Sequence, residues 1–392
     1  MPLISILLIA VFVLSACGPK AEPVSGTITL WHAWKENEIE SLNEVIAAFQ
    51  ALNPDAKFDT LYVPFDDLKG KYETATATGG GPTVLIGAAD WGPGFYDASL
   101  VADLSADLDA KFIDTINEAA LGAVQYKDAL IGLPQTLKGV VLFRNKTIVP
   151  AAATSLDDLI AKAKAATAGD VQGATLEYGF FFSAAHLDAV GGKLLETNGD
   201  PAFNNAKGVE WVNEIVKFKD AGTYFNYSDD DVNLFKAGKS GMIIDGTWNT
   251  ASLADAIGAD NLAIDPWPKG LSGYVQTENI YLNENATGAD REAGLAFIKF
   301  FLSEEAQNLL ANPTKAGHIP ATKGVEVTDP LMKASVEAFA GGAAFPVIPE
   351  MGAYWDPLNN ALKKAVDEGV DPAVALQAVS YTHLTLPTIY SV

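Results

Sequence analysis

Residue types that commonly carry catalysis are sparse in this chain. Neither an HExxH zinc motif nor a Gly-x-Ser-x-Gly nucleophile motif occurs, and the four histidines are far apart, at His32, His186, His318 and His383. Gly238-Lys239-Ser240 is similar to the end of a phosphate-binding loop, but Asn233 stands in place of the first glycine. The segment also precedes a predicted strand, whereas a phosphate-binding loop follows one. We therefore interpret it as a turn.

Clustered carboxylates are a second possible source of chemistry. Asp229-Asp230-Asp231 could hold a cation, but the apolar residues that follow indicate a helix start, where carboxylates cap the helix and pair with its dipole. We predict no metal site and no cofactor. Two carboxylates that act together on a glycosidic bond remain an open alternative, because their spacing is spatial and not sequential.

The lone cysteine, Cys17, follows an apolar run from Leu3 to Ala16 that is too short to span a bilayer as a helix. The run is typical of a secretory signal, although no Lys or Arg precedes it, and Leu14-Ser15-Ala16-Cys17 resembles a bacterial lipobox. We predict a lipoprotein signal peptide at residues 1–16 and a lipidated tether at residues 17–25. A free cysteine in a core helix is the alternative.

Composition narrows the function classes further. The chain has 392 residues, with 26 Lys+Arg against 49 Asp+Glu, which gives a net charge of −23. This charge argues against binding to nucleic-acid phosphates and against electrostatic docking on anionic lipid. One cysteine excludes a disulfide scaffold and a cysteine-based zinc site. The length predicts two or more domains.

Strand-like and helix-like segments alternate, which predicts the α/β class. The expected strands are 27–31, 57–63, 84–86, 130–134, 140–143, 178–182, 242–244, 262–265 and 280–282. The expected helices are 39–52, 66–78, 155–167, 206–221, 247–257 and 371–379. Residues 380–392 show neither period, so we interpret them as a poorly packed, non-native extension.

Short motifs in a fixed order suggest a family. They are Phe65-Asp66-Asp67-Leu68-Lys69, Gly87-Ala88-Ala89-Asp90-Trp91, Leu133-Pro134, Arg144-Asn145-Lys146, Gly179-Phe180, Phe235-Lys236-Ala237-Gly238, Met242-Ile243-Ile244-Asp245-Gly246-Thr247-Trp248 and Ile348-Pro349-Glu350-Met351-Gly352-Ala353-Tyr354-Trp355. The ordered set resembles the extracytoplasmic solute-binding proteins of ABC importers, of the maltose- and maltodextrin-binding group. The resemblance covers the chain from about Thr27 to Ala378.

The resemblance implies a two-lobed periplasmic-binding-protein fold, with a mostly parallel sheet flanked by helices in each lobe and crossing hinge strands between them. Carried over by position, residues 26–137 and 281–325 would form the N-terminal lobe. Residues 138–280 and 326–379 would form the C-terminal lobe, with crossings near 138–140 and 276–280. Ligand would lie in the cleft, and the lobes would close around it by hinge motion.

The resemblance also implies stacking rings at Trp248 and Trp355. A pyranose has an apolar face and a rim of hydroxyls, so it suits a flat ring with polar groups around it. Trp91 adjoins Asp90, whose carboxylate can accept two hydroxyls. Tyr354 is a further candidate. Core packing is the alternative for Trp248, Trp355 and Tyr354, and a helix cap is the alternative for Asp90.

Four more residues are candidate ligand contacts. For two of them, Lys138 and His186, a role outside ligand binding is also open. Trp34 and Lys35 follow a predicted strand and could face the cleft. Lys138 stands where the maltodextrin group commonly has Glu, so it could meet an acidic sugar or a phosphate, or form a salt bridge. His186 could bind a hydroxyl, or lie on the surface at a helix start.

We therefore predict a non-enzymatic, monomeric substrate-binding component of an ABC importer. It would capture a maltodextrin-like or related sugar and deliver it to permease transmembrane subunits, from an extracytoplasmic position held by the lipid on Cys17. One alternative keeps the fold but binds a polyol, an acidic sugar or a glycerophosphodiester through Lys138. A remote alternative is a secreted lipoprotein glycoside hydrolase.

Overall fold

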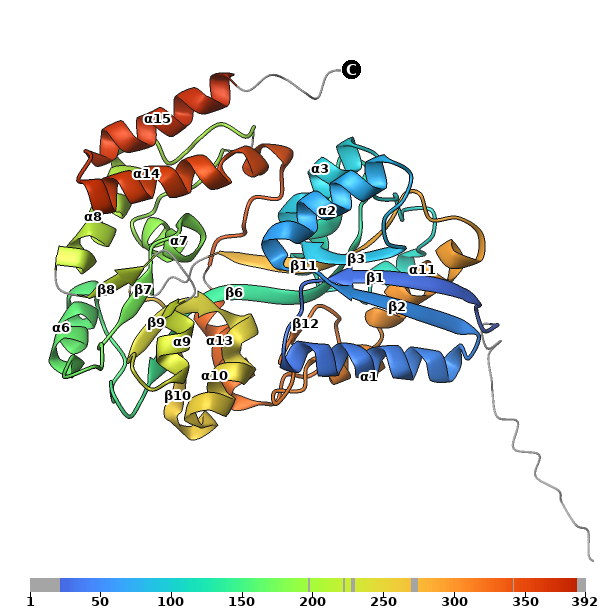
Figure 1. Ribbon diagram of the computed structural model, residues 1–392, viewed down its shortest axis with the longest axis horizontal. Helices are drawn as coiled ribbons and strands as arrows, with labels where there is room; N and C mark the ends of the chain where they lie inside the picture. Colours follow the sequence, from blue (N-terminus) through green and yellow to red (C-terminus); the bar gives the residue numbers. More distant parts are fainter. Residues whose placement is uncertain are drawn as a thin grey trace, which may run out of the picture.

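The structure is a computed structural model that describes residues 22–196, 198–220, 223–226, 230–268, 274–340 and 342–385. Figure 1 shows two lobes, one mainly blue, cyan and orange and the other mainly green, yellow and red, with strands β6 and β11 between them. The class predicted from sequence, a two-lobed α/β fold, is confirmed.

The first lobe contains the helices and strands of the first third of the chain, together with two later helices. Its elements are β1 (Gly26–His32), α1 (Asn37–Leu52), β2 (Ala56–Tyr62), α2 (Phe65–Ala77), β3 (Val84–Ala88), η1 (Ala89–Trp91), α3 (Gly92–Asp97), α4 (Ala110–Ile113), α5 (Glu118–Leu121), η2 (Gly122–Val124), β4 (Gln125–Tyr126), β5 (Ala129–Leu130), α11 (Gly288–Phe301) and α12 (Glu304–Leu310). Strands β6 (Leu133–Asn145), β11 (Val275–Leu282) and β12 (Ile319–Pro320) lie at the junction of the lobes.

The second lobe contains the remaining elements. They are α6 (Leu156–Ala166), β7 (Thr175–Glu177), α7 (Phe180–Ala189), α8 (Ala206–Asp220), β8 (Tyr224–Asn226), α9 (Asp230–Lys236), β9 (Met242–Gly246), η3 (Thr247–Asn249), α10 (Thr250–Ile257), η4 (Ala259–Asn261), β10 (Leu262–Asp265), α13 (Pro330–Phe339), η5 (Pro349–Ala353), α14 (Trp355–Glu368) and α15 (Pro372–Thr385). Helix α9 begins within the acidic run, and Gly238 adopts φ +68° in the turn after it, as expected for a helix end and not for a phosphate loop.

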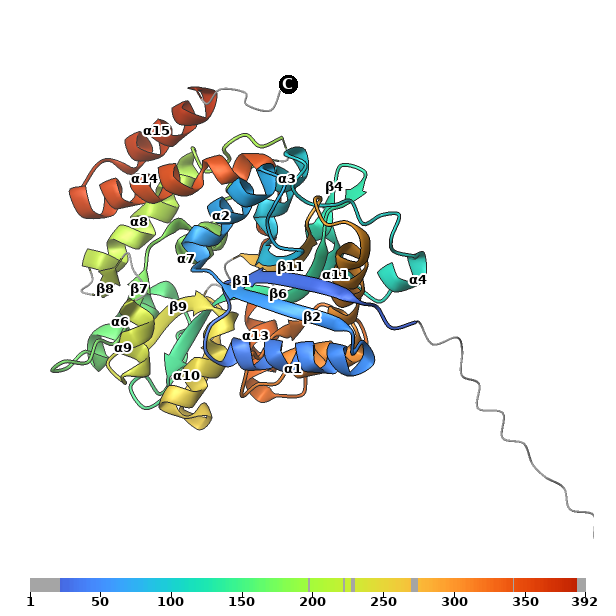
Figure 2. The same ribbon diagram turned by 45° about the vertical axis from the view of Figure 1, so that its right-hand side comes forward.

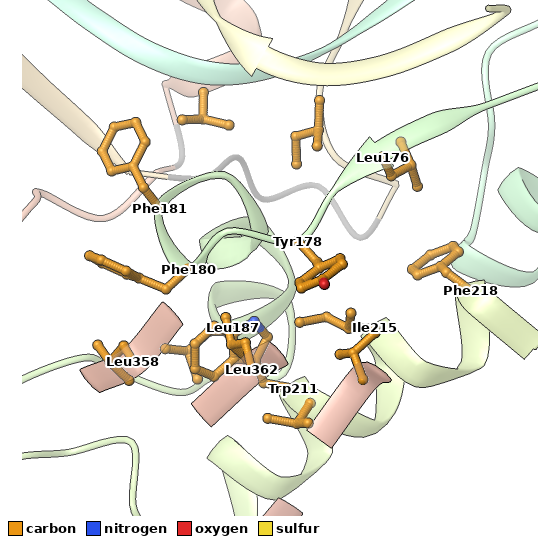
Figure 3. Packing of buried hydrophobic residues seen from close by; sticks show 14 of the residues in the cluster. Leu176, Tyr178, Phe180, Phe181, Leu187, Trp211, Ile215, Phe218, Leu358 and Leu362 are labelled. Carbon is orange, nitrogen blue, oxygen red and sulfur yellow. The ribbon is translucent and has the colours of Figure 1, made fainter. Parts of the chain in front are cut away.

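The strand expected at residues 178–182 is wrong. Strand β7 ends at Glu177, and α7 begins at Phe180, whose backbone N–H donates to Asn359 Oδ1 at 2.9 Å. A cap from a distant helix therefore starts α7, and local sequence carries no sign of it. Phe180 and Phe181, which read as strand residues by type, lie on this helix and pack into the core in Figure 3.

The central sheet is mixed, which corrects the expectation of mostly parallel sheets. Its strand order is β10-β6-β11-β3-β1-β2, with β9 and β12 also paired to β6. The pairs β1–β2 and β1–β3 are parallel, but β11 runs antiparallel to both β3 and β6. A strand that leaves one lobe and a neighbouring strand that returns to it must run in opposite directions. Figures 1 and 2 show α1 on one side of the first-lobe part of this sheet and α2 on the other.

Strand β6 belongs to both lobes. Its first half pairs with β11 and β12, and from Val140 onward it pairs with β9 and then with β10. Lys138 pairs with Gln276 at this transition, and β11 has a register shift between Glu278 and Asn279. The chain therefore crosses between the lobes on adjacent antiparallel strands. The lobe boundaries given above stay a prediction.

Separate hydrophobic clusters stabilise the two sides. In the first lobe, one face of α1 (Leu42, Val45, Ile46 and Phe49) packs with β1 and α11. In the second lobe, Trp211 of α8 is fully buried and donates through Nε1 to Ser183 O at 2.9 Å. Figure 3 shows Trp211 surrounded by side chains from α7 and α14, among them Leu187 and Leu362. Each lobe thus has its own hydrophobic core, and burial of apolar side chains in that core stabilises it.

The C-terminal segment differs from the sequence expectation. Helix α15 continues to Thr385, six residues past the expected end at Val379. Extending an existing helix costs less than nucleating a new one, so residues without helical periodicity can continue it. Residues 386–392 and Cys17 with its signal segment lie outside the described residues, so the extension and the lipid anchor stay predictions. Within the described ranges, no helix has the length and apolar character needed to cross a membrane.

Candidate functional site

Each lobe presents polar or aromatic residues where a fully buried strand ends. In the first lobe β3 leads into the turn η1, which carries Asp90; in the second lobe β9 leads into η3, which carries Trp248. Gly246 permits the second turn, because the Trp248 ring lies over its Cα and an added Cβ would come within 2.1 Å of that ring. Strand ends of this kind are where α/β folds place ligands.

Three rings of the second lobe form an aromatic row, which we define as Trp248, Phe181 and Trp355. Phe181 lies 6.4 Å from Trp248 and 6.0 Å from Trp355 between ring centroids, with interplanar angles of 26° and 29°. Phe181 is buried, whereas both tryptophans are half-buried. The row therefore offers partly exposed flat rings, the surface that suits the apolar face of a sugar. The sequence missed Phe181 because residues 178–182 resemble a strand.

Asp90 connects the first lobe to this row. Trp355 Nε1 donates to Asp90 Oδ2 at 3.2 Å, and this contact joins the start of α14 to η1. Burial raises the pKa of Asp90 above its usual value, and the Trp355 hydrogen bond and the Lys69 charge offset only part of that shift. The structure thus brings Asp90 and Trp355 together, as expected if both contribute to one site.

At the crossing strands, a second set of polar residues meets on one carboxylate. We call Glu278, Trp34, Gln135 and Lys138 the Glu278 group. Glu278 Oε2 accepts from Trp34 Nε1 at 2.7 Å and from Gln135 Nε2 at 2.7 Å, and Lys138 Nζ lies 3.0 Å away. Lys138 Nζ also lies 5.5 Å from the centre of the Trp248 ring. Sequence analysis missed Glu278 and Gln135, since strand residues carry no local sign of a cleft.

The prediction for Lys138 left two alternatives open, and the structure gives the salt bridge. Both side chains of the pair are almost enclosed, with 12% of Lys138 and 8% of Glu278 exposed. An ammonium beside a carboxylate in such a place is charge-compensated. Lys138 is therefore not an isolated positive charge that awaits an anion.

A small interlobe cavity, too narrow to hold a water molecule, touches the Glu278 group. It is lined by residues of β6, η3 and the segment before β12: Thr136, Leu137, Lys138, Thr247, Trp248, Gly317, His318 and Ile319. His318 is buried, its Nε2 lies 2.9 Å from Glu38 Oε1, and its Nδ1 has no partner within the described residues. A larger cavity of about 580 Å³ has a different lining, mainly small and apolar residues with no charged side chain, so we do not assign the candidate site to it.

Several predicted contacts are placed elsewhere by the structure. Trp91 packs in the first-lobe core beside Phe65 and Phe95 and is 6% exposed. Tyr354 is 1% exposed and donates to Gly199 O at 3.3 Å. Both side chains are enclosed in this structure, and their roles as ligand contacts stay predictions.

The remaining candidates near the first strand and on α7 have separate outcomes. Trp34 is 2% exposed, packs edge-on against His318 at 4.7 Å and donates through Nε1 to Glu278, so its role as a ligand contact stays a prediction. Lys35 is exposed in the loop before α1. His186 falls on α7, where its side chain lies outside the described residues, so its role stays a prediction.

The chain has two lobes joined by crossing strands, and an aromatic surface on one lobe lies beside polar groups of the other. This arrangement is that of a two-lobed binding protein. The family model described as "Bacterial extracellular solute-binding protein" matches residues 44–340, and the chain belongs to that family.

Individual proteins are similar to this chain over most of their length. The chain is 24% identical to a maltotriose-binding protein of Pyrococcus abyssi, over 89% of this chain and 79% of that protein. It is 23% identical to a galactooligosaccharide-binding protein of Bacillus subtilis, over 94% and 93%. The maltose/maltodextrin-binding domain MalE from Bdellovibrio bacteriovorus, solved with maltotriose bound, superposes with a TM-score of 0.83 at 23% identity and covers 92% of this chain and 99% of that one.

Proposed function

We propose that this protein is the carbohydrate-binding component of an ABC importer, which captures a neutral, maltodextrin-like oligosaccharide between its lobes. The observation that carries the proposal is the aromatic row of the second lobe, which lies beside the buried carboxylate of Asp90. Flat rings bind the C–H face of a sugar, and carboxylate oxygens accept its hydroxyls. The relatives named for maltotriose and galactooligosaccharides support the same ligand class.

We infer the partner and the location from relatives. A relative described as a maltooligosaccharide ABC transporter solute-binding lipoprotein supports permease transmembrane subunits as the partner of this chain. Cys17 in its lipobox-like context supports a lipid anchor at the outer face of the cytoplasmic membrane. Relatives described as solute-binding lipoproteins support this location. We propose a monomer, because ligand capture between two lobes of one chain needs no second copy.

Of the alternatives, the acidic or phosphorylated ligand is less favoured. It required a free positive charge on Lys138, but Glu278 compensates that charge at 3.0 Å. A new anion would have to displace a buried carboxylate or bind beside it, and like charges repel strongly in such a place. A neutral sugar meets no such cost.

The proposal is tested by calorimetric titration of the purified protein with maltotriose, galactotriose, glucuronate and glycerophosphocholine. We expect saturable binding of at least one neutral saccharide and none of the anionic ligand or the phosphodiester. Incubation with chromogenic glycosides should release no product. Failure to bind any saccharide would contradict the sugar-binding proposal, and product release would favour the hydrolase alternative.

A further inference from the structure

Glu278 occupies an unusual position on the returning strand β11. It lies at the register shift of that strand, beside the crossing strand β6, and is 6% exposed. Its partners come from two places: Trp34 from the loop after β1, and Gln135 and Lys138 from β6. One carboxylate therefore ties together the segments at the base of the two lobes.

The partners are distributed unevenly over the two carboxylate oxygens. All three donors lie at Oε2, and no described residue donates a hydrogen bond to Oε1. A carboxylate has about four acceptor positions, shared between its two oxygens. Oε1 is not among the fully enclosed unpartnered atoms of the described residues, so it is reachable from outside the protein. The contacts at Oε2 therefore hold Oε1 in a fixed position with its capacity to accept free for solvent or ligand.

Other polar atoms near the group also lack partners. Gln135 Oε1 and His318 Nδ1 are buried and accept or donate no hydrogen bond among the described residues. Gln135 contacts Glu278 directly, and His318 packs on the Trp34 ring and lines the small interlobe cavity. Unmet polar atoms on or beside the Glu278 group are what a hydroxyl-rich ligand could satisfy.

The group also lies beside the aromatic row. Lys138 Nζ is 3.0 Å from Glu278 Oε2 and 5.5 Å from the centre of the Trp248 ring, and Lys138 and Trp248 line the same cavity. Lys138 thus contacts both the Glu278 carboxylate and the Trp248 ring, which places the carboxylate next to the aromatic row. Since Lys138 balances the charge of Glu278, the pair presents an acceptor without presenting a net charge.

We propose that Glu278 is a ligand-binding, specificity-determining residue, and that its Oε1 accepts a hydrogen bond from a hydroxyl of a neutral saccharide lying against Trp248. This inference rests on the proposed function and names a contact within it. Three donors fix the carboxylate before ligand arrives, so little reorganisation is needed on binding. A site with a fixed acceptor rejects an analogue that lacks the matching hydroxyl.

The test compares E278Q with a matched control. In E278Q we expect the amide oxygen to replace Oε2, where it faces the three donors. The NH₂ group then replaces Oε1, so the sugar meets a hydrogen-bond donor instead of an acceptor. The control is D265N, which also changes a nearly enclosed carboxylate that pairs with a cation, Arg144, at 2.6 Å, but at the far end of β6. Affinities for maltotriose and galactotriose are measured by calorimetry, and melting temperatures by scanning calorimetry.

We expect both variants to melt lower than wild type, and E278Q alone to lose about tenfold or more in affinity for the saccharide that wild type binds. A set of monodeoxy analogues of that saccharide should include one that wild type binds more weakly than the complete saccharide. E278Q should bind this analogue and the complete saccharide with equal affinity. An E278Q affinity within about twofold of wild type, beside the lowered melting temperature, would overturn the inference and leave the sugar-binding proposal intact. If wild type binds neither saccharide, both the inference about Glu278 and the sugar-binding proposal are contradicted.

Discussion

Two tryptophans of the first lobe and two of the second differ in how far they are exposed. In the first lobe Trp34 and Trp91 are enclosed, at 2% and 6% exposure, and their rings contact other core residues. In the second lobe Trp248 and Trp355 are half-buried and flank Phe181 in the aromatic row. The first lobe instead supplies polar atoms at the junction, from Asp90 and from β11. One lobe thus offers rings and the other offers acceptors.

This division explains why a sugar-binding protein of this kind needs two lobes. A pyranose has an apolar face and a polar rim, so it is bound fully only when rings and acceptors meet around it. The Asp90–Trp355 hydrogen bond at 3.2 Å already joins one residue of each kind across the lobes. A ligand that contacts both lobes stabilises the arrangement in which they approach each other.

The largest expected effect is on folding, from a first-lobe ring. Trp34→Ala removes a buried indole and should lower the free energy of unfolding by about 3–5 kcal/mol. Chemical denaturation monitored by circular dichroism measures this. Unchanged stability with lost saccharide binding would contradict the comparison, because it would make Trp34 a cleft ring.

For Trp248 of the second lobe, we expect a larger effect on saccharide binding than on stability. Trp248→Ala should weaken saccharide binding by about 10- to 100-fold, since it removes a stacking surface, while lowering stability less than Trp34→Ala does. Calorimetric titration of both variants with maltotriose gives the comparison. An affinity equal to wild type would show that the aromatic row does not contact ligand.

Asp90→Asn sharpens the comparison through pH. Burial raises the pKa of Asp90 above its value in the unfolded chain, so stability is lost as pH rises from the unfolded pKa through the folded pKa and the buried carboxylate ionises. We expect Asp90→Asn to melt above wild type at pH 7, with the difference vanishing toward about pH 3. Its saccharide affinity should fall by several-fold, because a charged acceptor is lost. A lower melting temperature than wild type at pH 7 would contradict this reasoning.

The smallest effect concerns a contact between the lobes that is open to solvent. Lys236 of α9 lies 3.5 Å from Glu36 in the loop before α1, and both side chains are accessible. Such pairs contribute about 0–1 kcal/mol and are screened by salt. Glu36→Gln should therefore change saccharide affinity by at most a few-fold at low salt and not at all near 1 M salt. A large, salt-independent loss would assign Glu36 to the ligand.

Sequence patterns predicted much of the fold and part of the site. Helix α1 follows from its apolar spacing and stops at Asn53-Pro54, and the turns that carry Asp90 and Trp248 lie directly after the strands expected there. Residue type alone could not show which aromatic rings are accessible. Trp34, Trp91 and Tyr354 are large aromatics beside predicted cleft residues, yet they are enclosed, because the same ring suits a core or a sugar.

What the sequence determined by itself was local periodicity, the α/β class, the order of the motifs and the excess of acidic residues. Only the tertiary structure decided which rings remain accessible and which charges meet. Gln135 and Glu278 are 143 residues apart and are joined because β6 crosses between the lobes and β11 returns beside it. Burial and pairing depend on that antiparallel crossing, and no pattern within a few residues of Glu278 can show it.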